Sequence, residues 1–333
     1  LSGPVRKGEI ARLTQRVYAD FPAGRLQRLR TFGSFAKIFA SSDRRVPLRS
    51  QSSPGLASTT MSENRRPRLL VLIVAYHAEE TIQPTLARIP ASLLETYDVE
   101  VLVIDDSSTD STFEQSDAVR RSRTLPFPLT VLFNPDNQGY GGNQKIGLHY
   151  AIQQQFDFVV LLHGDGQYAP ECLPDLVEPL AKGEADAVLG SRMLRRADAL
   201  RGGMPLYKFL GNIILTTLQN RLLRSHLSEF HSGYRAYTAN ALRRIPFHLN
   251  TNAFHFDTEI IIQLMAAGLR IREMPIPTYY GDEICRVNGI TYAKDVLMAC
   301  VRALAQEWSL FYDRKFDCIP STTSNVHYKP RLG

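Results

Sequence analysis

Short runs of apolar residues alternate along most of the chain with stretches in which apolar residues recur every three or four positions. The runs are rich in Val, Leu and Ile, as strands buried on both faces of a sheet are, and they occupy residues 68–75, 99–104, 129–133, 156–162 and 186–190. The stretches between them predict helices, including helices from Asp110 or Ser111 toward Arg121, over 143–155 and over 171–182. This alternation predicts an α/β fold with a doubly wound, mostly parallel sheet flanked by helices.

The pattern is less regular in the last third of the chain. Residues 230–237 predict a loop and a short strand, and residues 271–276 predict an edge strand because Pro275 cannot donate a hydrogen bond to a neighbouring strand. Apolar residues at helical spacing predict amphipathic helices over 206–218 and 297–311. The first has basic ends and can lie on a membrane face or pack on the core. For the second we expect packing against the sheet or the earlier helix.

Acidic residues follow two of the predicted strands directly. Asp105 and Asp106 end the second strand, and Asp165 comes just after the fourth. The carboxyl ends of parallel strands form the edge where open α/β sheets bind ligands, so we expect these side chains to share one edge. Asp105 and Asp106 can accept hydrogen bonds from a ribose or a base, or they can cap the turn that follows.

The polar cluster after the fourth strand has the spacing of a cation site. His163, Asp165 and Gln167 alternate along a glycine-containing turn, so their side chains can supply ligands for one divalent cation. The alternative is that Asp165 only caps the next helix. Arg192, at the end of the strand over 186–190, can hold a phosphate in a bidentate way. The glycine-rich loop near Gly139 lets a nucleotide approach the backbone, but it is not the dinucleotide fingerprint.

The net charge of +6 is concentrated at the start of the chain. Residues 1–60 contain 11 Lys and Arg against three Asp and Glu, whereas the rest of the chain is slightly acidic. They are also rich in Arg, Ser and Pro, which predicts a basic, disordered extension before Met61; the alternative is a tether to an anionic membrane or to nucleic acid. We expect the main domain over 61–292, followed by an amphipathic helix and a loose tail over 293–333.

The cysteines and the hydropathy narrow the classes of protein. Four cysteines without metal-binding spacing predict free thiols in a reducing compartment: Cys172, Cys285, Cys300 and Cys318. No stretch of 18 or more apolar residues occurs, so the sequence predicts no membrane-spanning segment.

Taken together, residues 68–292 resemble the family 2 glycosyltransferases of the GT-A fold, and within them the polyprenyl-phosphate and dolichyl-phosphate sugar transferases. The likeness depends on four features in the right order: the Ala75-Tyr76 turn, the acidic segment Asp105 to Asp110, the cluster His163 to Gln167, and Ser232 to Arg235. The steps Gly190 to Arg192 and Arg286 to Gly289 also fit.

The resemblance implies an inverting, metal-assisted transferase that moves a hexose from a nucleotide sugar of the GDP-mannose or UDP-glucose type to a polyprenyl or dolichyl phosphate. It implies donor-binding residues Ala75, Tyr76, Glu79, Asp105, Asp106, Asn137, Gly139, Lys145 and Gly164. The implied ligands for Mg²⁺ or Mn²⁺ are Asp165, Gln167 and His163. The resemblance implies that Arg192 and Arg286, with Lys208, hold the acceptor phosphate. The acceptor-binding candidates are Lys208, Ser232, Arg235 and Arg286, and the catalytic candidates are Asp165, Arg192, Asp257 and Glu259. The expected localisation is cytoplasmic, with peripheral attachment to the cytoplasmic face of the membrane. No nucleic-acid partner is expected.

Two departures from the family pattern change the expected site. The family usually has an acid where His163 stands, so the cation is held either with an imidazole ligand or by Asp165 and Gln167 alone. The family also has Tyr-Asn-Glu where this chain has Tyr-His-Ala from residue 76, and Glu79 is the candidate substitute for the missing acid.

Other activities stay open on the sequence alone. A phosphate acceptor is ionised near neutral pH and needs no general base, whereas a hydroxyl acceptor does. Transfer to a sugar hydroxyl in polysaccharide or glycolipid assembly is therefore the first alternative, with Asp257, Glu259 or Asp282 as the base. A nucleotidyltransferase and a non-catalytic module that binds a nucleotide sugar or a membrane are further alternatives. An NAD-dependent oxidoreductase is disfavoured because the glycines do not follow the first strand.

Overall fold

The computed structural model describes residues 65–278 and 288–318. The chain divides into two units, Leu1–Arg66 and Pro67–Gly333, and nearly all described residues belong to the second. The extension expected over 1–60, the implied acceptor residue Arg286 and the candidate base Asp282 lie outside the described residues.

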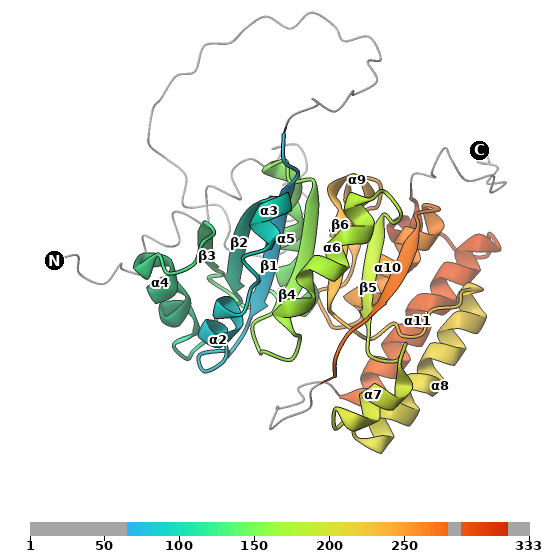
Figure 1. Cartoon of the computed structure of the whole chain (residues 1–333). Helices are drawn as coiled ribbons and strands as arrows, with labels where there is room; N and C mark the ends of the chain where they lie inside the picture. The colour runs from blue at the N-terminus through green and yellow to red at the C-terminus, as the bar shows by residue number, and fades with distance from the viewer. Residues whose placement is uncertain (1–64, 279–287, 319–333) are drawn as a thin grey trace, which may run out of the picture. The chain divides into compact units, whose positions relative to one another are not determined.

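A seven-stranded sheet forms the frame of the second unit, with strand order β3-β2-β1-β4-β6-β5-β7 (Figure 1). The neighbouring strands from β3 to β4 are parallel, and so are β5 and β7, whereas β6 is antiparallel to both of its neighbours. The predicted doubly wound, mostly parallel sheet is therefore confirmed, with one antiparallel strand inserted in it. The strands are β1 (Arg68–Ala75), β2 (Asp98–Asp105), β3 (Leu129–Phe133), β4 (Phe158–His163), β5 (Ala187–Ser191), β6 (Arg235–Thr238) and β7 (Ile271–Pro275).

Helices follow most of the strands and lie beside the sheet (Figure 1). The α-helices are α2 (Ile82–Ala87), α3 (Leu93–Thr96), α4 (Thr112–Ser122), α5 (Tyr140–Gln153), α6 (Leu173–Ala181), α7 (Arg196–Arg201), α8 (Leu206–Leu223), α9 (Ala239–Arg243), α10 (Phe256–Ala266) and α11 (Gly289–Glu307). Short 3-10 helices are η2 (Pro170–Cys172), η3 (Phe247–Leu249) and η4 (Arg314–Phe316).

The start of α5 differs from the prediction. The sequence predicts a helix from residue 143, but α5 begins at Tyr140 and includes two glycines in its first turn. A Cβ atom at Gly141 would lie 2.5 Å from the Thr251 carbonyl oxygen and 2.7 Å from Phe256 Cβ. The glycines therefore serve close packing of α5 against the segment before α10, and not only loop flexibility.

The core lies on both faces of β1, because alternate residues of a strand point to opposite faces. On one face Ile73 belongs to a cluster that includes Ile82 of α2 and Val177 of α6. On the other face Leu72 meets α5, where a Cβ atom at Gly147 would lie 2.3 Å from the leucine methyl groups. Close helix packing on each side fixes the ends of β1 and its neighbours in space.

The helices α8 and α11 lie side by side next to the second half of the sheet (Figure 1). Leu222 and Leu223 of α8 pack against a cluster that contains Ala299 and Cys300 of α11 and Phe316. The prediction that the second amphipathic helix packs against the earlier one is confirmed. Within the described ranges, none of the helices is long and apolar enough to cross a membrane, and three of the cysteines, Cys172, Cys300 and Cys318, are free thiols.

Candidate active site

The carboxyl ends of β2, β1 and β4 lie level with one another. Ala75 pairs with Asp105 on one side of β1, and Val74 pairs with His163 on the other. The backbone continues this register, since Asp106 N donates to the Ala75 carbonyl at 2.9 Å and Gly164 N donates to the Val74 carbonyl at 2.9 Å. Strands in a sheet are about 4.8 Å apart, so the ends of β2 and β4 are about 10 Å apart. We call Ala75, Tyr76, Asp105, Asp106, Gly164 and Asp165 the rim.

Asp105 places one buried carboxylate oxygen at the rim, and the rest of its side chain is held by Ser108. Its side chain is buried, and Oδ1 accepts a hydrogen bond from Ser108 N at 3.0 Å. Oδ2 is buried and has no hydrogen-bond partner among the described residues. Burial raises the pKa of Asp105 to about 6, against hydrogen bonds from Ser108 that lower it. An unpaired buried carboxylate oxygen costs free energy, which makes Oδ2 an acceptor for a ligand N–H or O–H.

Asp106 shapes the loop that follows β3. Its Oδ1 accepts from Asn134 Nδ2 at 2.8 Å and from Gln138 N at 2.8 Å, and burial raises its pKa. Asn137 continues the same loop by donating to the Asp106 carbonyl at 3.0 Å and accepting from Gly139 N at 2.9 Å. Gly139 has φ +76°, and a Cβ there would lie 2.8 Å from the Asn252 carbonyl oxygen. Asn137 and Gly139 therefore set the loop beside Asp105.

The residues after β1 border the same site. Tyr76 is exposed, and its ring lies 4.2 Å from that of His77. Glu79 Oε2 accepts from Ser111 N at 2.9 Å, and Glu79 N donates to Asp110 at 3.4 Å. Glu79 thus ties the loop after β1 to the start of α4, and the side chain of Tyr76 is exposed beside it.

Asp165 is exposed just beyond β4, next to the half-buried imidazole of His163. Its Oδ1 accepts from Gln167 N at 3.1 Å, and the Gly164 carbonyl is held by Thr81 Oγ1 at 2.7 Å. Burial lowers the pKa of His163, against Asp165, which raises it. His163 is thereby kept neutral near pH 7, the form in which imidazole can bind a metal ion.

The residues at this turn fit a divalent cation that a ligand completes. Across residues 65–278 and 288–318, the structure contains no group of three or more His, Cys, Asp or Glu that could hold a metal by itself. Asp165 nevertheless offers an exposed carboxylate, and the amide of Gln167 and the imidazole of His163 come from the same turn. Oxygen and nitrogen donors of this kind suit Mg²⁺ or Mn²⁺ when phosphate oxygens supply further ligands.

Arg235 is buried and does not face an open site, contrary to the role implied by the resemblance. Its three guanidinium nitrogens donate to the carbonyls of Ser232, Asp257 and Phe230 at 2.7, 2.7 and 2.8 Å. Arg235 also lies 3.7 Å from the Asp257 carboxylate. Ser232 is buried as well, and its Oγ accepts from Tyr234 N at 3.3 Å. The structure therefore shows Ser232 and Arg235 holding the loop before β6.

Arg192 is paired within the protein. Its Nε donates to Glu229 Oε1 at 3.0 Å, a second guanidinium nitrogen contacts the same oxygen, and its backbone N donates to Oε2 at 2.7 Å. Glu229 is fully buried and also accepts from Asn212 Nδ2 at 2.9 Å. The guanidinium of Arg192 therefore faces a buried carboxylate, and its bidentate contact with a phosphate stays a prediction.

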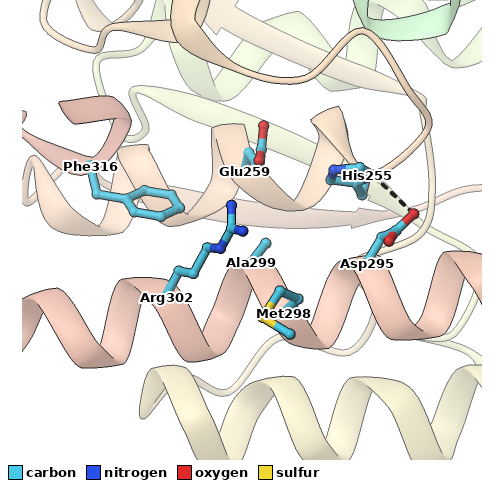
Figure 2. Close-up of a pocket in the computed structure, with 7 residues that line it drawn as sticks. All are labelled: His255, Glu259, Asp295, Met298, Ala299, Arg302 and Phe316. Carbon is cyan, nitrogen blue, oxygen red and sulfur yellow. Dashed lines mark ion pairs between the residues drawn. The ribbon is translucent and has the colours of Figure 1, made fainter. Parts of the chain in front are cut away.

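Asp257 and Glu259 point in different directions although both begin α10. Successive helix residues turn by about 100°, so residues two apart lie on nearly opposite faces. Asp257 accepts from Tyr140 Oη at 2.7 Å, close to His163. Glu259 accepts from Lys315 Nζ and Thr251 N at 2.7 Å each and lines a pocket of about 120 Å³ between α10 and α11 (Figure 2). The expectation that Glu259 belongs to the catalytic site is therefore not supported.

Two further expected residues come from the helices α5 and α8. Lys145 on α5 donates from Nζ to the Asn250 carbonyl at 2.8 Å, and burial lowers its pKa to about 8. The nearby charges of Glu259 and Lys315 place it on the Glu259 side of α10. Lys208 is half-buried in the first turn of α8.

The structure adds residues to the site that the sequence does not single out. Tyr140 and Tyr168 pack edge-to-face on the ring of His163, with ring centroids 5.5 and 5.0 Å away. His231 Nδ1 lies 3.0 Å from Tyr292 Oη, and burial lowers the pKa of His231 to about 4. These residues come from four separate segments, and only the position of Tyr140 directly after a glycine could have drawn attention to it.

The fold is GT-A-like, and the family comparison identifies the class of protein. Residues 70–245 match the family described as glycosyl transferase family 2. The match covers more than half of the chain, so the chain belongs to this family and is a glycosyltransferase. The prediction of a family 2 enzyme with a GT-A-like fold is confirmed.

Several similar proteins carry informative names. The undecaprenyl-phosphate mannosyltransferase of Micrococcus luteus is 28% identical over 245 residues, which cover 72% of this chain and 96% of that protein. The UDP-N-acetylglucosamine–dolichyl-phosphate N-acetylglucosaminyltransferase of Methanococcus voltae is 26% identical over 225 residues, 65% of this chain and 87% of that protein. The polyprenol monophosphomannose synthase of Mycolicibacterium smegmatis is 24% identical over 210 residues, 63% and 76% of the two chains.

The solved structures that resemble the chain include glucosyl-3-phosphoglycerate synthase from Mycobacterium tuberculosis. Its complex with UDP superposes with a TM-score of 0.54 at 18% identity, covering 72% of this chain and 80% of that chain. Its complex with Mn²⁺, UDP-glucose and phosphoglyceric acid gives a TM-score of 0.51 at 18% identity over the same shares. At this identity the likeness supports the fold alone.

Proposed function

We propose that this enzyme transfers a hexose from a nucleotide sugar to a polyprenyl phosphate and inverts the anomeric centre. The observation that carries the proposal is the rim itself. Asp105 Oδ2, a buried carboxylate oxygen without a partner in the described part of the chain, lies at the end of β2. The exposed carboxylate of Asp165 lies just after β4, on the other side of β1. A nucleoside diphosphate has an N–H donor at one end and an anionic diphosphate at the other. Held with its base at Asp105, it reaches a cation at Asp165.

The donor occupies the rim in an extended arrangement. Asp105 accepts from the base, and the exposed side chain of Tyr76 lies at the same rim. The loop shaped by Asp106, Asn137 and Gly139 closes the site beside the nucleoside. Because Asp105 is deprotonated above its pKa of about 6, it accepts a hydrogen bond at neutral pH without a change of protonation.

The leaving group is the part of the reaction that needs stabilisation. Breaking the bond between the sugar and the diphosphate develops negative charge on the nucleoside diphosphate and positive charge on the anomeric carbon. Asp165, Gln167 and His163 would hold a divalent cation, whose positive charge beside the diphosphate lowers this barrier. The structures of a fold neighbour bound to Mn²⁺ and UDP-glucose support a cation of this kind.

The names of the relatives support a lipid phosphate as the acceptor. Three similar proteins are named for undecaprenyl, dolichyl or polyprenol phosphate. A phosphate oxygen is already ionised, so the attack needs no general base. Asp257 accepts a hydrogen bond from Tyr140 and pairs with Arg235. These contacts disfavour the alternative in which Asp257 removes a proton from a sugar hydroxyl. Attack from the face opposite the leaving group inverts the anomeric centre.

The exposed apolar residues of α8 support a membrane surface next to the acceptor. They recur every fourth residue along the solvent-facing side of the helix: Leu206, Leu210, Ile214 and Leu218. Exposed aromatic residues follow the end of α11, at Trp308, Phe311 and Tyr312. A stripe of this kind binds the interface between headgroups and acyl chains. We propose peripheral attachment through α8, with Lys208 at its first turn near the acceptor phosphate.

The transfer assay tests the reaction directly. Each of several GDP- and UDP-sugars, labelled in the sugar, is incubated with polyprenyl phosphate and with Mg²⁺ or Mn²⁺, and the organic phase is counted. We expect label in the lipid for one donor and a loss of about 100- to 1000-fold in kcat for Asp165→Ala. Asp198→Ala, which removes an exposed carboxylate of α7, is the matched control. A loss below tenfold for Asp165→Ala contradicts a cation at Asp165, and label in a water-soluble sugar favours the hydroxyl acceptor.

Vesicle flotation tests the membrane proposal. Ile214→Glu places a charge in the middle of the exposed stripe, and we expect at least a tenfold weaker partition onto vesicles with anionic lipid. Arg243→Glu, at an exposed position of α9 and not on α8, reports the loss of charge attraction alone. Equal flotation of Ile214→Glu and wild type contradicts attachment through α8.

A further inference from the structure

His163 has a ring that is held on three sides. Tyr140 and Tyr168 pack edge-to-face against it. A Cβ atom at Gly233 would come within 2.6 Å of its Nε2 and Cε1 atoms, so only glycine leaves room for this edge of the ring. Nε2 faces Tyr140 Oη at 3.4 Å. The position of the ring is therefore fixed by contacts other than a metal ion.

The hydroxyl group of Tyr140 has one proton, and the geometry assigns it to Asp257. Oη lies 2.7 Å from Asp257 Oδ2, much closer than it lies to the imidazole. Asp257 stands 3.7 Å from the guanidinium of Arg235 and 3.5 Å from Gln144 Nε2, so it is surrounded by donors and accepts from Tyr140. Because Oη has no second proton, it can only accept from Nε2, which must then carry a hydrogen.

We infer that Tyr140 fixes His163 in the tautomer protonated at Nε2, and that Nδ1 is thereby kept as a nitrogen ligand for the cation at Asp165. The inference deepens the proposed function and rests on it. Nδ1 makes no hydrogen bond with any described residue. Histidines that bind metals ordinarily donate their second N–H to a carboxylate or carbonyl, which sets the tautomer. Here the carboxylate of Asp257 accepts the proton of the Tyr140 hydroxyl, and the hydroxyl oxygen then accepts from Nε2 of His163. Tyr140 is therefore a positioning residue.

A nitrogen ligand changes the ion that the site prefers. Mg²⁺ prefers oxygen ligands and a near-ideal octahedral arrangement, whereas imidazole suits first-row transition ions. The site should therefore bind Mn²⁺ more tightly than Mg²⁺, by at least about tenfold, the lower range of what a supporting residue contributes to metal affinity. The same argument predicts that an acid at this position would favour Mg²⁺ more.

The tautomer can be read without metal, donor or turnover. Long-range ¹H–¹⁵N correlation spectra of protein labelled in histidine distinguish a protonated Nε2 from a protonated Nδ1. We expect His163 to be protonated at Nε2 in wild type and to become a mixture in Tyr140→Phe, with Tyr76→Phe as the matched control. A wild-type ring protonated at Nδ1, or a Tyr140→Phe spectrum identical to wild type, overturns the inference. The wild-type spectrum decides the first point even if the variant folds poorly.

Metal competition tests the consequence for the cation. The Mn²⁺ signal in electron paramagnetic resonance is followed as Mg²⁺ displaces the bound ion, in the presence of UDP or GDP. We expect the preference for Mn²⁺ to fall at least about fivefold in His163→Asp and in Tyr140→Phe. Equal preferences in wild type and His163→Asp overturn the role of Nδ1. A wild-type protein that binds neither nucleotide contradicts the proposed function instead, and the tautomer measurement separates the two failures because it uses neither nucleotide nor metal.

Discussion

At the ends of β2 and β4, acidic side chains keep oxygen atoms that have no partner among the described residues, whereas beside β5 and β6 the cations Arg192 and Arg235 are already paired. Asp105 Oδ2 is buried and has no hydrogen-bond partner among the described residues, and Asp165 is exposed. Arg192 faces the buried Glu229, and Arg235 is enclosed by three carbonyls and Asp257. The first region is prepared for a ligand, and the second gives the scaffold its rigidity. A charged residue at a strand end therefore indicates a binding role only when the structure shows that its charge is not already paired within the protein.

Loss of the buried pair between Arg235 and Asp257 should have the largest effect on stability. Arg235→Met removes a buried guanidinium and leaves Asp257 without its cation, so we expect the free energy of unfolding to fall by about 3–5 kcal/mol. Urea unfolding followed by circular dichroism measures it. The exposed Arg221→Met is the control, with an expected change within about 0.5 kcal/mol. A loss for Arg235→Met as small as that of the control would mean that Arg235 is not structural.

Substitution of Asp105 should have opposite effects on the affinity for the nucleotide sugar and on the stability of the free protein. Asp105→Asn replaces the charged acceptor, and we expect nucleotide-sugar affinity to fall by about ten- to a hundredfold, as loss of a hydrogen bond to a charged group costs about 1.5–3 kcal/mol. The free protein should become more stable at pH 7 by up to about 3 kcal/mol, because a buried charge without a partner disappears. Isothermal titration calorimetry and urea unfolding measure the two. Weaker binding together with lower stability would indicate general damage.

The gain in stability should depend on pH. The folded-state pKa of Asp105 is raised to about 6 from an ordinary value of 3.8. A carboxyl with a raised pKa lowers stability as the pH rises from about 4 to 6, because the folded protein must then hold the charge in a buried place. The difference between Asp105→Asn and wild type should be full above pH 6 and vanish near pH 4. A difference that is constant across this range contradicts burial of an ionised Asp105.

The smallest effect is expected at Glu259, which lies on the far face of α10. Glu259→Gln should change the transfer rate less than about threefold, because its contacts are Lys315 and Thr251 and not the rim. The initial rate of label transfer measures it. A loss of a hundredfold or more would show that the pocket in Figure 2 takes part in the reaction.

The first region was predictable because its signals are local. Apolar runs gave the strands, and register then placed Asp105 and Asp165 on one edge, since adjacent parallel strands end level. The contacts beside β5 and β6 could not be predicted, because the residues that pair there are far apart in sequence. Arg192 meets Glu229 across the long helix α8, and Arg235 meets Asp257 across α9 and η3. Sequence spacing shows that these residues are charged but not which charge lies opposite each, and the same holds for Tyr140 and His163.

The central claim is that the nucleoside and the cation occupy one pocket across β1. Mn²⁺ binding, measured by electron paramagnetic resonance with and without the accepted nucleotide sugar, tests it most directly, because ligands that share a site through the diphosphate must raise each other's affinity equally. The account predicts at least about a tenfold rise in Mn²⁺ affinity with donor, which Asp165→Asn abolishes and Asp105→Asn weakens. An Mn²⁺ affinity that is the same with and without donor would contradict it.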